Sequence, residues 1–203
     1  MWIDISQELK IGMNVWPGDV EFQYHKTLKI SEGDSVNTGK ITMSSHTGTH
    51  IDAPFHYDDN GISIEKMDIN RLSGIAEIVN LEGVKQIDYH TVAGLLPFET
   101  TILIFKTTEQ EHDYDSYPSF TKEAAELLSK NGIQMIGTDG PSVDPLTSKD
   151  LPAHHAFNTH HIYILEGLRL QHVNPGLYEF MALPLPIKGA DGSPVRAVIR
   201  EME

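Results

Sequence analysis

Short stretches rich in branched or aromatic side chains recur along the chain and predict a structure made mainly of β-strands. The predicted strands are Gly74–Leu81, Thr101–Lys106, Ile133–Thr138, His161–Leu165, Tyr178–Leu185 and Val195–Arg200. Helical patterns are fewer, and capping residues or prolines bound them. The predicted helices are Glu123–Leu128 after a Thr121 cap, a segment near Ile87–Leu95, and a third starting at Leu151 and Pro152.

Strands outnumber helices and do not alternate regularly with them. This order argues against a doubly wound or barrel fold and favours a β-rich α/β class. No repeat or linker divides the chain, so we expect a single domain over residues 1–203. A chain of this length can bury about 70% of its surface, which is enough for one sizeable core. The acidic segment Glu109–Ser119 predicts a surface loop.

The amino-acid composition limits the partners, reactions and metal sites that the chain can have. The chain has 15 basic and 29 acidic residues, a formal charge of −14, eleven histidines and no cysteine. The negative charge argues against nucleic acid and anionic membranes as partners. The lack of cysteine excludes thiol catalysis, disulfides and cysteine-ligated metal sites, so imidazole and carboxylate must hold any metal. With no signal peptide or membrane-spanning run visible in the sequence, we expect a cytoplasmic protein.

The first of two histidine-rich windows contains His46, His50 and His56. As an extended chain, this window would place His46, His50 and Asp52 on one face. Four residues of straight strand span about 13 Å, too far for both imidazoles to reach one ion, so Gly48 is expected to curl the chain. Pro54 then turns the chain and presents His56 from another direction, a position that suits a general acid or base.

The second window supplies four further imidazoles, those of His154, His155, His160 and His161. The residue types alone do not decide which of them is a ligand. Glu166 follows at the end of an apolar strand, where a buried carboxylate is unfavourable unless a cation compensates it. A solvated acid at a helix end is the alternative, but strand ends are where sites assemble. The two windows together predict a metal site.

Residues 46–56, His-Thr-Gly-Thr-His-Ile-Asp-Ala-Pro-Phe-His, resemble the signature of the metal-dependent cyclase-like hydrolases. The best-known members of that family are bacterial kynurenine formamidases, also called arylformamidases. Further segments that look like family segments follow in family order: Trp16–Asp19, Ser142–Pro145, His154-His155 with Glu166, and Asp191–Ala197. The resemblance covers nearly the whole chain.

The resemblance implies a swivelling β/β/α fold, a homodimer or homotetramer, and two divalent metal ions per subunit. Zinc is the favoured metal and manganese the alternative, because imidazole–carboxylate sites accept several divalent ions. By motif position, His46, His50 and Asp52 would hold one ion. Asp52 would bridge to the second, which His154 and Glu166 would complete.

The implied reaction is removal of the formyl group from N-formyl-L-kynurenine, or a similar small aromatic amide, in tryptophan degradation. Metal-activated hydroxide would attack the formyl carbon, with His56 as general acid and base. Trp16 would line the substrate pocket. One alternative is a sister hydrolase that opens a cyclic amide such as isatin or acts on another small carbonyl compound. The other is a non-catalytic metal-binding sensor domain, which would have no use for His56.

Overall fold

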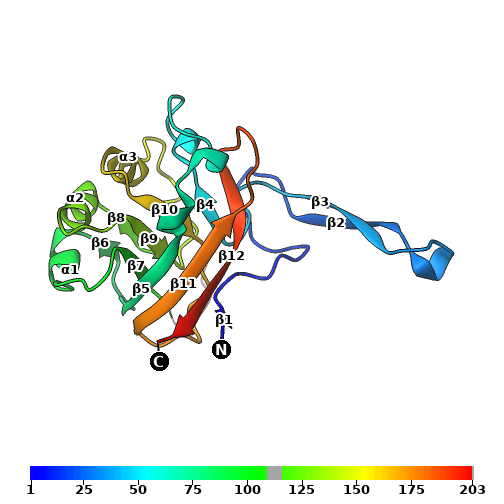
Figure 1. Ribbon diagram of the computed structural model, residues 1–203. Helices are drawn as coiled ribbons and strands as arrows, with labels where there is room; N and C mark the ends of the chain where they lie inside the picture. The colour runs from blue at the N-terminus through cyan, green and yellow to red at the C-terminus, as the bar shows by residue number, and fades with distance from the viewer. Residues whose placement is uncertain (109–115, 203) are drawn as a thin grey trace.

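The computed structural model describes residues 1–108 and 116–202 (Figure 1). The strands are β1 (Ile3–Asp4), β2 (Gln23–Leu28), β3 (Thr38–Thr42), β4 (His50–Asp52), β5 (Ser73–Asn80), β6 (Gln86–Ile87), β7 (Ile102–Lys106), β8 (Ser119–Phe120), β9 (Met135–Thr138), β10 (Tyr163–Glu166), β11 (Gly176–Pro184) and β12 (Gly192–Glu201). The helices are α1 (Tyr89–Ala93), α2 (Lys122–Lys130) and α3 (Pro152–Thr159).

The main sheet runs in the order β1-β12-β11-β5-β7-β9-β10-β4, and β4 pairs again with β12. This second pairing closes the sheet into a ring, with parallel pairing from β5 through β7 and β9 to β10 and antiparallel pairing elsewhere. The β-rich α/β class is therefore confirmed, but the expectation against a barrel was wrong. Closure depends on strands far apart in sequence, which the local order of elements does not reveal.

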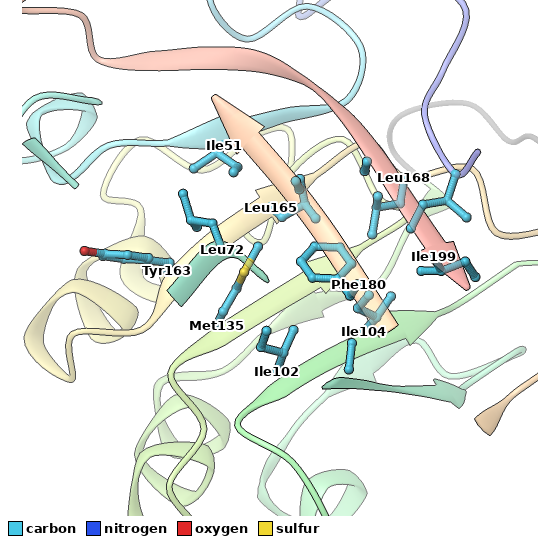
Figure 2. Packing of buried hydrophobic residues seen from close by; sticks show 14 of the residues in the cluster. Ile51, Leu72, Ile102, Ile104, Met135, Tyr163, Leu165, Leu168, Phe180 and Ile199 are labelled. Atoms are coloured by element: carbon cyan, nitrogen blue, oxygen red, sulfur yellow. The ribbon is translucent and has the colours of Figure 1, made fainter. Parts of the chain in front are cut away.

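Two apolar cores follow from this ring. Inside it, side chains such as Ile51, Leu165 and Phe180 pack between β11 and β12 on one side and the parallel strands on the other (Figure 2). Outside it, α1, α2 and α3 lie together on one flank of the sheet (Figure 1). There Phe105 and Phe157 belong to a second buried cluster. Side chains therefore alternate between the ring interior and the helical layer along the parallel strands.

All six predicted strands are present, with ends shifted by a few residues. The Thr121 cap of α2 is confirmed, because its side chain accepts a hydrogen bond from the Ala124 amide, and α3 begins at Pro152 as predicted. The helix expected near Ile87–Leu95 is shorter, because Ile87 pairs in β6. Most of the predicted surface loop lies outside the described residues, and Ser119 belongs to β8.

A second, two-stranded sheet, β2 with β3, was not predicted and extends away from the body (Figure 1). None of the helices in residues 1–108 and 116–202 combines the length and apolar character that a membrane crossing requires.

Candidate metal centre

Strand β4 lies between β10 and β12 and carries two of the predicted ligands. His50 stands opposite Glu166 of β10, and Asp52 stands opposite Gly192 of β12. Because side chains alternate along a strand, Ile51 packs inside the ring while His50 and Asp52 point to the other face, toward α3. Local strand pairing thus brings a histidine and two buried carboxylates together.

His46 reaches the same place from the turn that precedes β4. It is not part of an extended strand as predicted, because residues 45–49 form a turn followed by a bend. The predicted curl at Gly48 is confirmed: its φ of 67° is a conformation that glycine adopts without strain. The turn places His46 Nδ1 2.9 Å from Asp52 Oδ1. The Gly48 carbonyl also accepts a hydrogen bond from His50 Nδ1 at 2.9 Å, which leaves His50 Nε2 facing the carboxylates.

His154 projects into the site from the first turn of α3. Its Nε2 lies 3.4 Å from Asp52 Oδ2 and 3.5 Å from Glu166 Oε1. Asp144 holds it there by accepting hydrogen bonds from His154 Nδ1 at 2.7 Å and from the His154 backbone amide at 3.0 Å. His155 and His161 are exposed. The structure therefore brings His154, among the four imidazoles of its window, to the carboxylates.

Sequence reasoning assigned no role to Asp144, although it lies in a segment that resembles the family. The sequence indicates this role only indirectly, because Asp144 is an acidic residue 10 positions before His154, in a loop next to the helix that carries His154. The need for a carboxylate behind a metal-binding histidine is general, but its position in sequence is not.

The surroundings of Asp52 show whether these residues fit a metal ion. It is 1% exposed, and neither of its oxygens accepts a hydrogen bond from the described residues. Three imidazole nitrogens nevertheless face it at 2.9 to 3.4 Å. A buried carboxylate without hydrogen bonds is costly unless a cation compensates it. The set of nitrogen and oxygen donors fits a divalent ion such as zinc.

The protonation states of His50, His154 and Asp52 also indicate that these residues fit a divalent ion. Burial alone would lower the pKa of His50 and His154, but the negative charges of Asp52 and Glu166 beside both rings, together with the hydrogen bond from His154 to Asp144, outweigh it and raise both pKa values to about 10. Burial raises the pKa of Asp52, yet the facing imidazoles hold it well below the ordinary value. The metal-free chain therefore keeps protons where a cation would otherwise balance the carboxylates.

His56 follows Pro54 in a short 3-10 turn at the edge of the site. Its ring centroid lies 3.9 Å from that of His46. Burial lowers the pKa of His56 below its ordinary value, so the ring is neutral near pH 7 and able to take a proton. The ligand atoms of His46, Asp52 and His56 lie within 4.8 Å of one another, as do those of His50, Asp52 and Glu166.

Asp191 is a second residue for which the sequence suggested no role. Its Oδ2 accepts a hydrogen bond from His46 Nε2 at 2.9 Å and lies 3.5 Å from His56 Nδ1. Ser45 Oγ donates to its other oxygen at 2.8 Å. Asp191 thus links the two histidines at the outer edge of the site.

A pocket of about 270 Å³ opens above these groups. The predicted site residues that line it are Trp16, His46, His50, His56, His154 and Glu166. Asp52 lies buried beneath it. The half-buried Trp16 adds a flat apolar surface to the lining of the same pocket. The arrangement can hold a cation at the floor of the pocket and a small aromatic molecule above it.

Comparison with known proteins agrees with this geometry. Residues 3–145 match the model of the "Putative cyclase" family. The kynurenine formamidase of Geobacillus thermodenitrificans (strain NG80-2) is 49% identical over 209 residues, which cover 99% of this chain and 98% of that protein. A solved structure described as a potential metal-dependent hydrolase with cyclase activity is 29% identical with a TM-score of 0.85, covering 100% of this chain and 99% of that one.

Isatin hydrolase A from Labrenzia aggregata superposes with a TM-score of 0.80, covering 98% of this chain and 93% of that one. At 22% identity it shares the fold alone. The family model and the Geobacillus relative, in contrast, match most of this chain in sequence. The chain therefore belongs to the cyclase family that its histidine motif resembles.

Proposed function

We propose that this chain is a metal-dependent arylformamidase that removes the formyl group from N-formyl-L-kynurenine. The observation that carries the proposal is buried Asp52, faced by three imidazoles at the floor of a pocket that Trp16 lines. The formamidase relative, 49% identical over nearly the full length of both chains, supports the choice of substrate.

The metal ligands belong to the proposal. His46, His50 and Asp52 would hold one divalent ion, and Asp52, His154 and Glu166 the other, with zinc favoured over manganese. His50 Nε2 lies 3.4 Å from both Asp52 and Glu166, so it is close to a carboxylate of each proposed ligand set. When bound, such ions lower the pKa of water and stabilise negative charge on a carbonyl oxygen.

The chain's own residues orient the ligands and move the proton. The Gly48 carbonyl and Asp144 fix the rings of His50 and His154 with Nε2 toward the carboxylates. Neutral His56 would accept a proton from the attacking water and donate it to the arylamine as the carbon–nitrogen bond breaks. Formate and the free amine leave. Trp16 would pack against the aromatic ring of the substrate and hold the amide over the site.

The experiment is turnover of N-formyl-L-kynurenine and of isatin by the same preparation, after its metal content is measured. We expect bound divalent metal and faster hydrolysis of N-formyl-L-kynurenine. Faster hydrolysis of isatin would instead identify the sister activity. Bound metal without turnover of either compound would favour the sensor domain.

Three further sequence predictions stay with this proposal: a homodimer or homotetramer, a cytoplasmic location, and residues 1–203 as one domain. A small amide substrate requires neither nucleic acid nor membrane as a partner.

A further inference from the structure

The pocket above the metal centre has an acidic lining residue, Asp19, that the proposed mechanism does not use. Asp19 and Trp16 both line the pocket and stand at the two ends of one tight turn. Pro17 follows Trp16, Gly18 has a φ of 88°, and the Asp19 amide donates to the Trp16 carbonyl at 2.9 Å. This is the pattern of a type II β-turn, whose first and last Cα atoms lie within about 7 Å of each other. The turn therefore fixes a carboxylate next to the aromatic wall of the pocket.

The carboxylate of Asp19 is held in place but can still accept hydrogen bonds. Its Oδ1 accepts a hydrogen bond from the Val20 backbone amide at 2.7 Å. Within residues 1–108 and 116–202 the carboxylate accepts no other hydrogen bond and forms no ion pair. A carboxylate can accept several hydrogen bonds through its two oxygens. The second oxygen of the half-buried Asp19 is therefore available to a cationic group that enters the pocket.

The rest of the lining determines which charge the pocket accepts. Among the described residues that line it, none is a lysine or an arginine, and Glu166 at the floor is the other acid. The neutral polar groups of the lining are the Gln7 amide and the hydroxyls of Ser142 and Ser148. A ligand with an ammonium group thus meets a carboxylate. A ligand carboxylate meets no cationic side chain outside the histidine cluster.

N-formyl-L-kynurenine, the substrate in the proposed function on which this inference rests, carries both charges. Its formamide and its amino-acid side chain are attached to neighbouring ring carbons, so both come close to the metal centre. Carboxylate oxygen is itself a good ligand for a divalent ion. The α-carboxylate of the substrate would therefore compete with the formyl oxygen, whereas the α-ammonium group would not. Productive binding requires a group that directs the amino-acid end away from the metal centre.

We propose that Asp19 selects substrates that carry an aliphatic ammonium group. It would accept a hydrogen bond from the α-ammonium group and repel the α-carboxylate, with the aromatic ring against Trp16 and the formamide over the metal centre. Asp19 binds and positions the substrate and takes no part in proton transfer. The favoured substrates are then arylformamides with an ammonium group on the side chain, and anionic arylformamides without one are disfavoured.

The test compares three formamides that share one aromatic skeleton. They are N-formyl-L-kynurenine, its decarboxylated analogue, which keeps only the ammonium group, and its desamino analogue, which keeps only the carboxylate. The value of kcat/KM is measured for the metal-loaded wild type and for Asp19→Asn, whose side-chain oxygen can still accept the Val20 amide. We expect the variant to lose about 5- to 50-fold on the two compounds with an ammonium group. It should gain about 2- to 5-fold on the desamino analogue, because the repulsion is gone.

Glu21→Gln is the matched control. Glu21 is exposed, lies two positions after Asp19 and does not line the pocket, so its loss changes the net charge by the same amount. We expect the control to leave the three kcat/KM values unchanged. An equal loss on all three compounds in Asp19→Asn would indicate a purely structural role and overturn the proposal. A similar change of preference in Glu21→Gln would overturn it too.

Binding of the three deformylated products, measured by calorimetry, is a second readout. Asp19→Asn should weaken the binding of the two products that carry the aliphatic ammonium group and should not weaken that of the third. Uniform binding changes would overturn the role of Asp19. Because these products bind without being hydrolysed, this measurement decides the role of Asp19 even if no formamide is turned over, an outcome that would refute the formamidase proposal alone.

Discussion

Replacement of Asp144 by asparagine should weaken metal binding without changing any ligand. In the native chain Asp144 accepts a hydrogen bond from His154 Nδ1 at 2.7 Å, so the ring that gives up one proton on metal binding has its lone pair on Nε2, which faces Asp52 and Glu166. The asparagine oxygen can still accept a hydrogen bond from a backbone amide, but the NH₂ group of the asparagine then faces His154 Nδ1. The ring would respond by carrying its proton on Nε2, where a metal ligand needs a lone pair.

The expected magnitude follows from two contributions. Loss of a partner behind a metal-binding histidine typically lowers metal affinity 10- to 100-fold, or about 1.4 to 2.7 kcal/mol. Asp144 also accepts the amides of Ala153 and His154 at 3.0 Å, which caps the first turn of α3. Weakening such a cap destabilises the metal-free protein by about 1 kcal/mol. The two effects are measured separately, because one concerns the metal equilibrium and the other the unfolding equilibrium.

The assay is competition for zinc between metal-free protein and a chromophoric chelator, together with urea unfolding of the metal-free form. Asp150→Asn is the matched control, since Asp150 is an exposed acid next to the same helix start. We expect Asp150→Asn to leave zinc affinity unchanged. Wild-type affinity in Asp144→Asn, or an equal fall in Asp150→Asn, would refute the role of Asp144 in orienting His154.

The stability effect of Asp144→Asn should depend on pH. Burial would raise the pKa of Asp144, but hydrogen bonds from the His154 ring and from the backbone outweigh it and lower the pKa below 3.8. The stabilising contribution of the carboxylate is therefore present above the unfolded-state pKa of 3.8 and is lost as the pH falls through the folded-state value. The destabilisation measured near neutral pH should shrink in strongly acidic buffer.

Four other outcomes follow from the site. His56→Gln should lower kcat about 10²- to 10⁴-fold while metal content, measured by mass spectrometry, stays at the wild-type level; undiminished turnover would exclude the acid–base role. Zinc affinity should fall as the pH is lowered from about 8 to about 6, because the raised pKa values of His50 and His154 make the metal compete with protons; a flat profile would contradict this. Gly167→Ala should lower the free energy of unfolding by about 1 to 3 kcal/mol, since φ is 67° and the added Cβ would lie 2.4 Å from the Gly48 carbonyl oxygen. Gly83→Ala, with a similar φ but open space around it, is the control and should have a smaller effect in the same urea titration. Trp16→Ala should raise KM for N-formyl-L-kynurenine more than it lowers kcat, and the opposite pattern would argue against a binding role.

Local features of the site were predictable from the sequence. The need for a curl between His46 and His50 followed from the length of a strand, and Gly48 supplies it. The placement of Glu166 at the end of a buried strand was visible in the apolar run before it. Such predictions succeed because they depend on a few consecutive residues and on standard backbone geometry.

Features that depend on distant pairing were not predictable in the same way. The sheet closes because β4 pairs with β12, and no local sequence pattern predicts that contact. The roles of Asp144 and Asp191 appear only when the loops carrying them lie against His154 and His46. The two-stranded sheet of β2 and β3 was not predicted, because its exposed strands lack the buried, apolar runs by which the other strands were recognised.

Closure of the ring also bears on how the protein is made. His46 and its partner Asp191 are 145 positions apart, and the bond from Thr49 to the Gly167 carbonyl spans 118 positions. The histidine window therefore leaves the ribosome long before the strands that complete it. During synthesis β4 has neither of its neighbours, because β10 and β12 both come from the last third of the chain. Contacts of such long sequence separation slow folding. The last stretch of translation thus delivers the ring closure, and a chain that ends before β12 would carry all five proposed ligands without the strand that closes the ring beside β4.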